Sequence, residues 1–378
     1  MRDAETTSRF PQNWKRRSGT SRNSAARCRV RRKIRLLLIV LSLLFGCSAQ
    51  DVPSQAAPAQ VFDHVLLISV DGLRADAVAD SGALPGFARL LQGQHTLNAR
   101  TDPDFTVTLP NHLCMVSGRG TLGTGGHQWT SNGEPKPGAT VHDGAGYVAS
   151  IFDVAHDQGL GTAVLAGKSK FSLFDASWNE RSGAPDITGA DNGRDKIDLY
   201  LFDEDAADLT SAALAFLQRE GRHLLFLHYR DCDAAGHDAG WDMTAGSKYR
   251  QAVAAVDREI VRLLDAVQAD GELRGTTAIL LTADHGGGAP FKSHDRADAP
   301  ADYTIPLLIW LAPGQAAADL YALNPARADP GTGKGGDRPP IRNRDCAGLA
   351  LDLLGLPPLP ASGPGAPERL RYGPVAAE

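Results

Sequence analysis

Ala278-Ile279-Leu280-Leu281-Thr282-Ala283-Asp284-His285-Gly286-Gly287-Gly288 is an apolar run that ends in a carboxylate, an imidazole and three glycines. The run has the length and composition of a buried β-strand, and the glycines indicate a loop directly after it. Two other apolar runs have the same form, since residues 65–70 lead into Asp71 and residues 224–229 precede Asp233. Three strands that each end in potential metal ligands predict one site along the edge of a sheet.

The order of the remaining segments predicts an α/β fold. Further strands are expected over residues 161–165 and 305–311, and helices over residues 84–91, 108–116, 147–157, 205–218, 247–269 and 345–354. Strands that alternate with helices favour a mostly parallel central sheet with helices on both faces. Ligands of such sheets bind at the carboxyl ends of the strands, where the three runs place their Asp and His residues.

The charge is unevenly distributed along the 378 residues. Residues 1–46 hold 12 Lys/Arg and 2 Asp/Glu, so the remainder holds 27 basic and 42 acidic residues, a net charge of −15. Binding of a nucleic-acid duplex requires a basic surface to match its phosphates. The acidic body of this chain therefore argues against that class of partner and favours bound cations.

The basic N-terminal segment has the pattern of a targeting signal. Arg31-Arg32-Lys33-Ile34-Arg35 precedes an apolar run over residues 36–46, which is too short to span a bilayer but suits a signal peptide. Residues 44–47 resemble a bacterial lipobox in which Cys47 is acylated, and ordinary cleavage near Ala49 is the alternative. We expect export to the periplasm, with a lipid anchor at Cys47 as the membrane attachment.

This pattern also divides the chain. Residues 1–46 are expected to be the targeting segment, residues 47–60 a tether, and residues 61–360 one catalytic domain. Residues 172–204 show little periodicity and are predicted to be a small inserted cap region. Residues 361–378 are predicted to be a tail, and the oligomeric state stays open.

Three aspartates and three histidines follow the predicted strands: Asp71, Asp233, His237, Asp284, His285 and His294. Asp233 and His237 stand four residues apart, so on a helical turn their side chains face the same way and can share a metal ion. Mixed Asp/His sets suit zinc, and less specifically manganese or iron. Six ligands are enough for two ions.

Thr108 is the candidate nucleophile. It begins a predicted helix, where backbone N–H groups and the helix dipole favour an anion. A hydroxyl beside a divalent ion can become an alkoxide nucleophile. Taken alone, a threonine at this position is an ordinary helix cap.

Five stretches carry a resemblance in one order along the chain: Ser69-Val70-Asp71-Gly72, Thr108-Leu109-Pro110-Asn111-His112 with Val116-Ser117-Gly118, Asp233-Ala234-Ala235-Gly236-His237, Thr282-Ala283-Asp284-His285-Gly286, and His294 before Ile305-Pro306. Together they resemble the alkaline phosphatase superfamily, and within it the type I phosphodiesterase/nucleotide pyrophosphatase family. The resemblance covers roughly residues 61–356 and implies an alkaline phosphatase-like fold.

The resemblance also implies a site with two zinc ions. One ion would be held by Asp233, His237 and His294, and the other by Asp71, Asp284, His285 and the oxygen of Thr108. Thr108 would attack phosphorus to form a covalent intermediate, which water would hydrolyse. The chain is therefore expected to cleave phosphodiester or phosphoanhydride bonds of a small phosphorylated substrate.

Three further residues are expected to bind substrate. Asn132 stands near the place of an asparagine that in the family often donates to the phosphoryl oxygen, although the loop before it is longer here. Lys168 and Lys170 resemble the Lys-x-Arg pair of members that cleave phosphate monoesters, which carry an extra negative charge that cations stabilise. A solvated loop is the alternative interpretation of the two lysines.

Two other functions stay open. A phosphomonoesterase would use Lys168 and Lys170 to bind the phosphoryl group. A catalytically inactive, metal-stabilised binding lipoprotein would normally have lost a ligand or the nucleophile, whereas all seven positions are filled here. A sulfatase is disfavoured, because it needs Cys or Ser in a Cys/Ser-x-Pro-x-Arg setting and this chain has Thr108 without such an arginine.

Overall fold

A computed structural model describes residues 60–186, 193–311, 317–328, 338–360 and 369–373 of the chain. The chain divides into two units, Met1–Ala56 and Ala57–Glu378, and the first lies outside the described residues. The predicted targeting segment and residues 47–59 of the predicted tether also lie outside them, so export and the anchor at Cys47 stay predictions. Within the described part, no helix combines the length and the apolar character needed to cross a bilayer.

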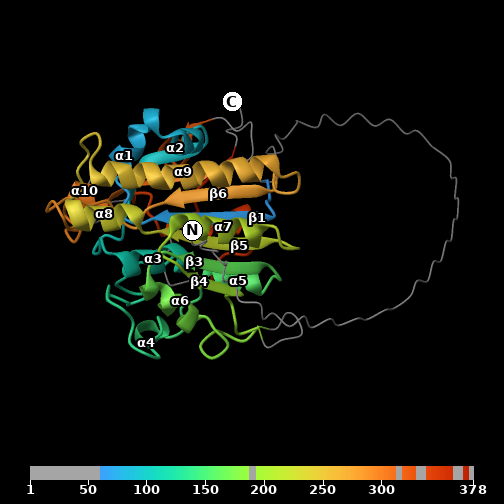
Figure 1. Cartoon of the computed structure of the whole chain (residues 1–378). Helices are drawn as coiled ribbons and strands as arrows, with labels where there is room; N and C mark the ends of the chain where they lie inside the picture. The colour runs from blue at the N-terminus through green and yellow to red at the C-terminus, as the bar shows by residue number, and fades with distance from the viewer. Residues whose placement is uncertain (1–59, 187–192, 312–316, 329–337, 361–368, 374–378) are drawn as a thin grey trace, which may run out of the picture. The chain divides into compact units, whose positions relative to one another are not determined.

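An eight-stranded sheet forms the centre of the fold, in the order β4-β3-β5-β1-β6-β7-β2-β8 (Figure 1). β7 runs antiparallel to both of its neighbours, and the other paired strands are parallel. The strands are β1 (His64–Val70), β2 (Gln94–Arg100), β3 (Gly161–Ala166), β4 (Leu199–Phe202), β5 (His223–Tyr229), β6 (Thr277–Thr282), β7 (Thr304–Trp310) and β8 (Ala318–Asp319). The prediction of a mostly parallel central sheet is confirmed.

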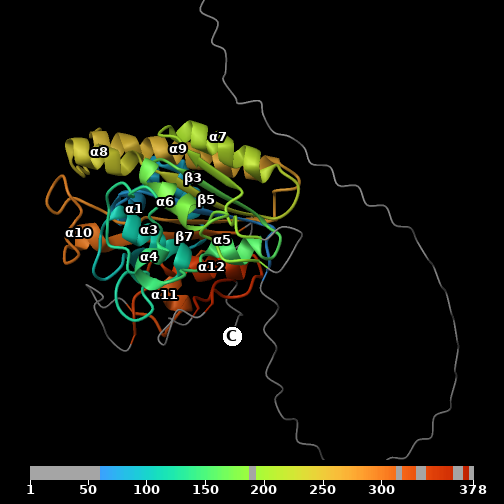
Figure 2. The same cartoon turned by 90° about the horizontal axis from the view of Figure 1, so that it is seen from below.

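Helices cover both faces of the sheet, as Figure 2 shows, with α7, α8 and α9 on one side and α3, α5 and α12 on the other. The longer helices are α3 (Thr108–Ser117), α7 (Ala206–Leu217), α8 (Asp231–Ala239), α9 (Lys248–Ala269) and α12 (Asp345–Leu353). The shorter ones are α1 (Ala75–Ala79), α2 (Pro85–Leu90), α4 (His142–Ala145), α5 (Ile151–His156), α6 (Ser172–Ser177), α10 (Pro300–Tyr303) and α11 (Leu320–Leu323), with 3₁₀ turns η1 (Ser81–Ala83) and η2 (Ser169–Phe171).

The three apolar runs of the sequence are the middle of the sheet. Every residue of β1, β5 and β6 is buried, because helices cover both faces and leave no polar side. β1 lies between β5 and β6, and Val70 is level with Tyr229 while Ser69 is level with Thr282. The three strands therefore end at the same edge of the sheet.

One predicted boundary differs from the structure, and the strand β2 was not predicted, each for a local reason. The helix expected over residues 147–157 begins only at Ile151, because Ser150 and Asp153 form a reciprocal capping box there. The strand β2 has no apolar run to mark it, since its residues alternate between buried and partly exposed beside the short edge strand β8.

The predicted cap region and tail fall partly on described residues. Within residues 172–204, α6 leads to the fully buried Trp178 and β4 is an edge strand of the sheet. A substrate-covering role for this region stays a prediction, and residues 187–192 lie outside the described part. In the tail, Arg371 N donates to Asn324 Oδ1 and Gly373 N donates to Gln94 Oε1, so residues 369–373 are held against β2 and α11.

Candidate active site

The site is assembled from the carboxyl ends of four neighbouring strands. Asp71 follows β1, and Asp284 follows β6. Asp233 lies on α8, the helix that begins two residues after β5, and Lys168 follows β3. Because these strands are parallel and adjacent, residues far apart in the sequence come together at one edge.

Asp233, His237 and His294 form the first cluster, and their ligand atoms lie close enough to hold one ion. Asp233 Oδ1 is 3.3 Å from His237 Nε2 and 3.7 Å from His294 Nε2. The side chain of His237 is 49% exposed, whereas the other two are almost fully buried. The first cluster therefore faces solvent beside His237.

Asp71, Asp284 and His285 form the second cluster and are fully buried, and the set here whose ligand atoms all lie close enough to hold one ion is Asp71, His285 and the neighbouring Asp233. His285 Nε2 lies 3.4 Å from Asp71 Oδ1 and 3.2 Å from Asp284 Oδ2. It is also 3.9 Å from Asp233 Oδ1, and the ring of His285 stacks on that of His294 with centroids 3.5 Å apart. The two clusters are therefore direct neighbours.

The three histidines of the clusters are held in one tautomer. The Nδ1 atom of each lies within hydrogen-bonding distance of a backbone carbonyl oxygen: His237 with Lys292, His285 with Gly286, and His294 with Thr106. A carbonyl oxygen only accepts, so we assign the ring proton to Nδ1. Each Nε2 then presents its lone pair to the cluster, which is the orientation of histidines that bind metals.

Four buried ligand atoms in the two clusters have no hydrogen-bond partner: Asp71 Oδ1, Asp233 Oδ1, Asp284 Oδ2 and His285 Nε2. Buried polar atoms without partners are costly, and all four are acceptors that a cation would satisfy. Burial and the neighbouring charge of Asp71 raise the pKa of Asp284 well above its usual range, so this carboxyl ionises readily only beside a cation. The residues thus fit two divalent ions.

Lys168 lies between the two clusters. Its Nζ is 2.7 Å from Asp71 Oδ2, 2.6 Å from Asp233 Oδ2 and 3.5 Å from Thr108 Oγ1. Burial alone would lower the pKa of Lys168, but the two carboxylates raise it above its usual value. The side chain is therefore an ammonium group in contact with both carboxylates.

Thr108 is the first residue of α3 and is buried. The start of this helix is braced by its own side chains, since Asn111 Nδ2 donates to Val107 O and His112 Nδ1 donates to Thr108 O. Asn111 Oδ1 also accepts from the backbone N–H of Asp102. The predicted nucleophile is thus held in a rigid turn.

The structure places Asn132 and Lys170 at the same helix start. Asn132 Oδ1 accepts a 2.9 Å hydrogen bond from Leu109 N, directly after Thr108. Lys170 Nζ donates to the backbone oxygen of Asn132 over 2.7 Å. Asn132 and Lys170, which are predicted to bind substrate together with Lys168, therefore lie near the start of α3.

His228 is a site residue that the sequence did not indicate as one. It is fully buried on β5, its Nε2 donates to Asp71 Oδ2 over 2.9 Å, and its Nδ1 accepts from Gly167 N over 3.1 Å. Although burial alone would raise the pKa of Asp71, Lys168 and this hydrogen bond hold it well below its usual range. The feature of the sequence that could have identified His228 is the presence of a histidine inside an otherwise apolar strand.

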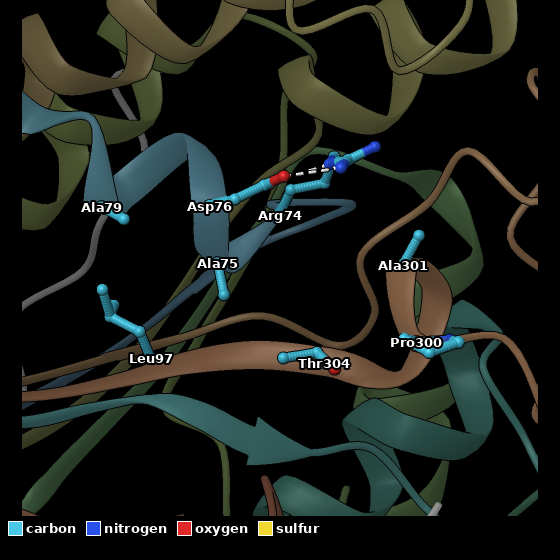
Figure 3. Close-up of a pocket in the computed structure, with 8 residues that line it drawn as sticks. All are labelled: Arg74, Ala75, Asp76, Ala79, Leu97, Pro300, Ala301 and Thr304. Atoms are coloured by element: carbon cyan, nitrogen blue, oxygen red, sulfur yellow. Dashed lines mark hydrogen bonds and ion pairs between the residues drawn. The ribbon is translucent and has the colours of Figure 1, made fainter. Parts of the chain in front are cut away.

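A pocket of about 420 Å³ lies beside α1 and the start of β7 (Figure 3). It is lined by Arg74, Ala75, Asp76, Ala79, Leu97, Pro300, Ala301 and Thr304. Figure 3 shows Arg74 paired with Asp76, so the cation of this pocket is already neutralised. None of the predicted site residues lines the pocket.

Comparison with known proteins identifies the family. The family model described as type I phosphodiesterase / nucleotide pyrophosphatase matches residues 65–329. The chain belongs to this family. As a type I phosphodiesterase/nucleotide pyrophosphatase family member, it has Thr108 and the six Asp and His residues of the two clusters within the matched range.

Curated relatives of this family member are longer proteins. It is 26% identical to GPI ethanolamine phosphate transferase 1 of Saccharomyces cerevisiae over 68% of the chain and 28% of that protein. The corresponding transferase of Candida glabrata is 25% identical over 69% of the chain and 28% of its own length. The chain thus spans between a quarter and a third of these relatives.

Solved structures confirm the fold. A protein of the alkaline phosphatase superfamily from Vibrio parahaemolyticus superposes with a TM-score of 0.53 at 14% identity, covering 79% of this chain and 68% of that one. Murine ectonucleotide pyrophosphatase / phosphodiesterase 5, solved as an inactive variant in complex with AMP, gives 0.51 at 14% identity, covering 78% and 96%. At this identity the likeness concerns the fold alone.

Proposed function

We propose that the protein is an exported two-metal phosphohydrolase that cleaves small phosphodiesters or phosphoanhydrides through a covalent intermediate on Thr108. The observation that carries the proposal is the pair of Asp/His clusters with four unpartnered buried ligand atoms, joined through Lys168 to the Thr108 hydroxyl. Family membership supports the same class of reaction.

In this proposal Asp233, His237 and His294 hold one ion, and Asp71, Asp284 and His285 hold the other with Thr108 beside it. Zinc is the metal that the mixed imidazole and carboxylate donors fit best. When bound, two such ions stabilise the entering and leaving oxygens of an in-line displacement and favour deprotonation of a nearby hydroxyl.

Thr108 Oγ loses its proton to water and forms the new bond to phosphorus, while the leaving oxygen departs with the electron pair of the broken ester bond and takes up a proton from water. The braced start of α3 keeps the hydroxyl in place for this attack, which removes part of its orientational cost. Water then attacks the phosphorylated threonine and restores the hydroxyl. The exposed side of His237 is where we place the exit of the leaving group.

Some relatives are named as ethanolamine phosphate transferases, and this is relevant to the second step, in which the phosphorylated threonine is released. A phosphorylated threonine can pass its group to an alcohol as well as to water, and a hydrolase and a transferase can therefore share this site. We propose small phosphodiesters as the substrate class of this chain, and an added alcohol such as ethanolamine should divert part of the product.

A phosphomonoesterase is the second candidate. It is favoured by Lys170, whose described contacts are with oxygen atoms of Asn132, so its charge is not matched by a carboxylate there. It is disfavoured by Lys168, whose charge two carboxylates already match. The contacts of Lys170 are the reason why the phosphomonoesterase function is tested as well.

Hydrolysis of bis-p-nitrophenyl phosphate and of p-nitrophenyl phosphate by zinc-loaded protein separates the candidates. The proposal expects a higher kcat/KM for the diester and loss of activity with a chelator. Preference for the monoester would select the second candidate. No turnover of either substrate would favour the remaining alternative, a catalytically inactive binding protein.

Export rests on the N-terminal pattern and is part of the proposal. Cell fractionation of the full chain should recover it with the envelope, and Cys47→Ala should release it to the soluble periplasm if the lipid anchor forms. Recovery of the unprocessed chain from the cytosol would reject export.

A further inference from the structure

The geometry points to a second task for Lys168. We propose that its ammonium group is a positioning residue that orients Asp71 and Asp233, so that one oxygen of each carboxylate faces a divalent ion. The inference rests on the proposed function, because it presupposes ions at both clusters. It differs from the substrate-binding role predicted from the sequence.

The two oxygens of each carboxylate have separate surroundings. Lys168 Nζ contacts the Oδ2 atoms of Asp71 and Asp233, at 2.7 and 2.6 Å. The Oδ1 atoms of the same two side chains are buried without a hydrogen-bond partner. Each carboxylate therefore turns one oxygen to the lysine and leaves the other for a metal.

The free oxygens are those that face the histidines. Asp71 Oδ1 is 3.4 Å from His285 Nε2, and Asp233 Oδ1 is 3.3 Å from His237 Nε2. These contacts belong to different clusters, so Lys168 joins the two clusters from one point. It can do so without occupying the atoms that the ions would take.

The buried carboxylates of Asp71 and Asp233 both contact the same ammonium group. Without a cation between them, these two negative charges would repel each other. The Lys168 side chain is only 15% exposed, so its charge is poorly screened by water. An ammonium group has three N–H donors, of which two are used here by the carboxylates. The third reaches toward Thr108 Oγ1 at 3.5 Å and ties the nucleophile to the same point.

The backbone around Lys168 is held as firmly as its side chain. Gly167, directly before it, donates to His228 Nδ1, and His228 Nε2 donates to the same Asp71 oxygen that Lys168 contacts. Asp71 Oδ2 thus has two donors, one that follows β3 and one on β5. The loop is fixed before any substrate arrives, which suits a positioning role.

Lys168→Met tests the proposal, because it keeps the length of the side chain and removes the charge and the donors. Lys170→Met is the matched control, since Lys170 contacts Asn132 and neither carboxylate. The readouts are zinc stoichiometry, zinc affinity by competition with a chelator, and the absorption spectrum of the cobalt(II)-loaded protein. Circular dichroism checks that each variant is folded.

We expect Lys168→Met to weaken zinc binding by about tenfold or more and to alter the cobalt spectrum. Lys170→Met should bind zinc and cobalt like the wild type. Lys168→Arg keeps the charge and should recover part of the affinity, which also covers the case in which the methionine variant fails to fold.

Unchanged affinity and spectrum in Lys168→Met, with only KM for the diester raised, would make Lys168 a substrate contact and overturn the proposal. Tighter zinc binding would overturn it as well, because the lysine would then compete with the ions. Failure of the wild-type protein to bind zinc would instead reject the proposed function itself.

Discussion

His237 Nε2 lies 3.2 Å from His294 Nε2, although the Nδ1 atom of each ring already faces a backbone carbonyl oxygen. With both ring protons on Nδ1, neither Nε2 has a proton to share, and two lone pairs meet. The contact requires a positive charge, either a metal ion between the rings or a proton on His237, whose pKa the neighbouring Asp233 raises. The first cluster is therefore a place where positive charge is held.

Removal of divalent ions should lower the thermal stability of the protein. An ion that binds only the folded state, at 100 times its Kd, adds about 2.7 kcal/mol to the free energy of unfolding. Calorimetry with and without a chelator measures this, and zinc added back in excess should restore the melting temperature. Equal melting temperatures under both conditions would contradict metal binding at the clusters.

Thr108→Ala should reduce the hydrolysis of a phosphodiester by about a thousandfold or more, because the attacking oxygen is lost. Its zinc content should equal that of the wild type, since the Asp and His side chains remain. Thr108→Ser keeps the hydroxyl and should retain measurable turnover. Activity of the alanine variant near the wild-type level would show that Thr108 is an ordinary helix residue.

His228→Leu should weaken zinc binding by about 10- to 100-fold through the misplacement of Asp71. Loss of the buried hydrogen bonds should also lower the free energy of unfolding by about 1–3 kcal/mol. His223 lies at the opposite end of the same strand and serves as the control, because His223→Leu should leave zinc affinity unchanged. Equal zinc affinities of the wild type and His228→Leu would remove the link between His228 and Asp71.

Gly72→Ala should be unusually damaging for an exchange to alanine. Gly72 has a φ of +70°, and a Cβ there would lie 2.9 Å from the Cα atom of Asp233. The turn after β1 and the backbone of α8 would be forced apart, so both stability and zinc affinity should fall. Gly159 has a φ of +78° with open space around it, and Gly159→Ala should cost only the backbone strain of about 1–2 kcal/mol. Equal effects of the two exchanges would refute the close-approach argument.

Acid should destabilise the protein through His127, which lies away from both clusters. Burial lowers the pKa of this histidine to about 4, from a usual value near 6.5. Between these two pH values the unfolded chain binds the proton and the folded protein does not, so stability falls as pH falls. His127 should therefore lower the free energy of unfolding by about 3 kcal/mol between pH 7 and pH 4.

Urea denaturation at several pH values measures this loss. His127→Gln keeps a donor for Pro110 O and has no proton to gain, so its stability should fall less steeply with acid. Parallel curves for the two proteins would show that His127 does not govern the acid response.

The central part of the fold follows from short-range patterns in the sequence. β1, β5 and β6 are continuous apolar runs because both of their faces are covered, and their bounds agree with the prediction to within one residue. The long helix α9, predicted over residues 247–269, buries a stripe of residues at helical spacing: Val253, Val256, Ile260, Leu263, Leu264 and Val267. The convergence of the predicted site residues at one edge follows from the parallel order of the strands.

Other features depend on contacts between distant segments and leave little trace in the sequence. β2 is polar at five of its seven positions and lies near the edge of the sheet, next to β8. The bridge from Lys168 to Asp71 and Asp233 joins residues that are 97 and 65 positions apart, and only the packed sheet brings them together. His228 acts through Asp71, so no ligand spacing in the sequence identifies it.

The reversed direction of β7 has a consequence for the order in which the ions are bound and released. Because β7 starts at the edge where β6 ends, residues 283–303 stay at that edge and supply Asp284 and His285 to one cluster and His294 to the other. One connection thus serves both ions. A shift of this connection would move ligands of both clusters, so the two ions are expected to enter and leave cooperatively rather than independently.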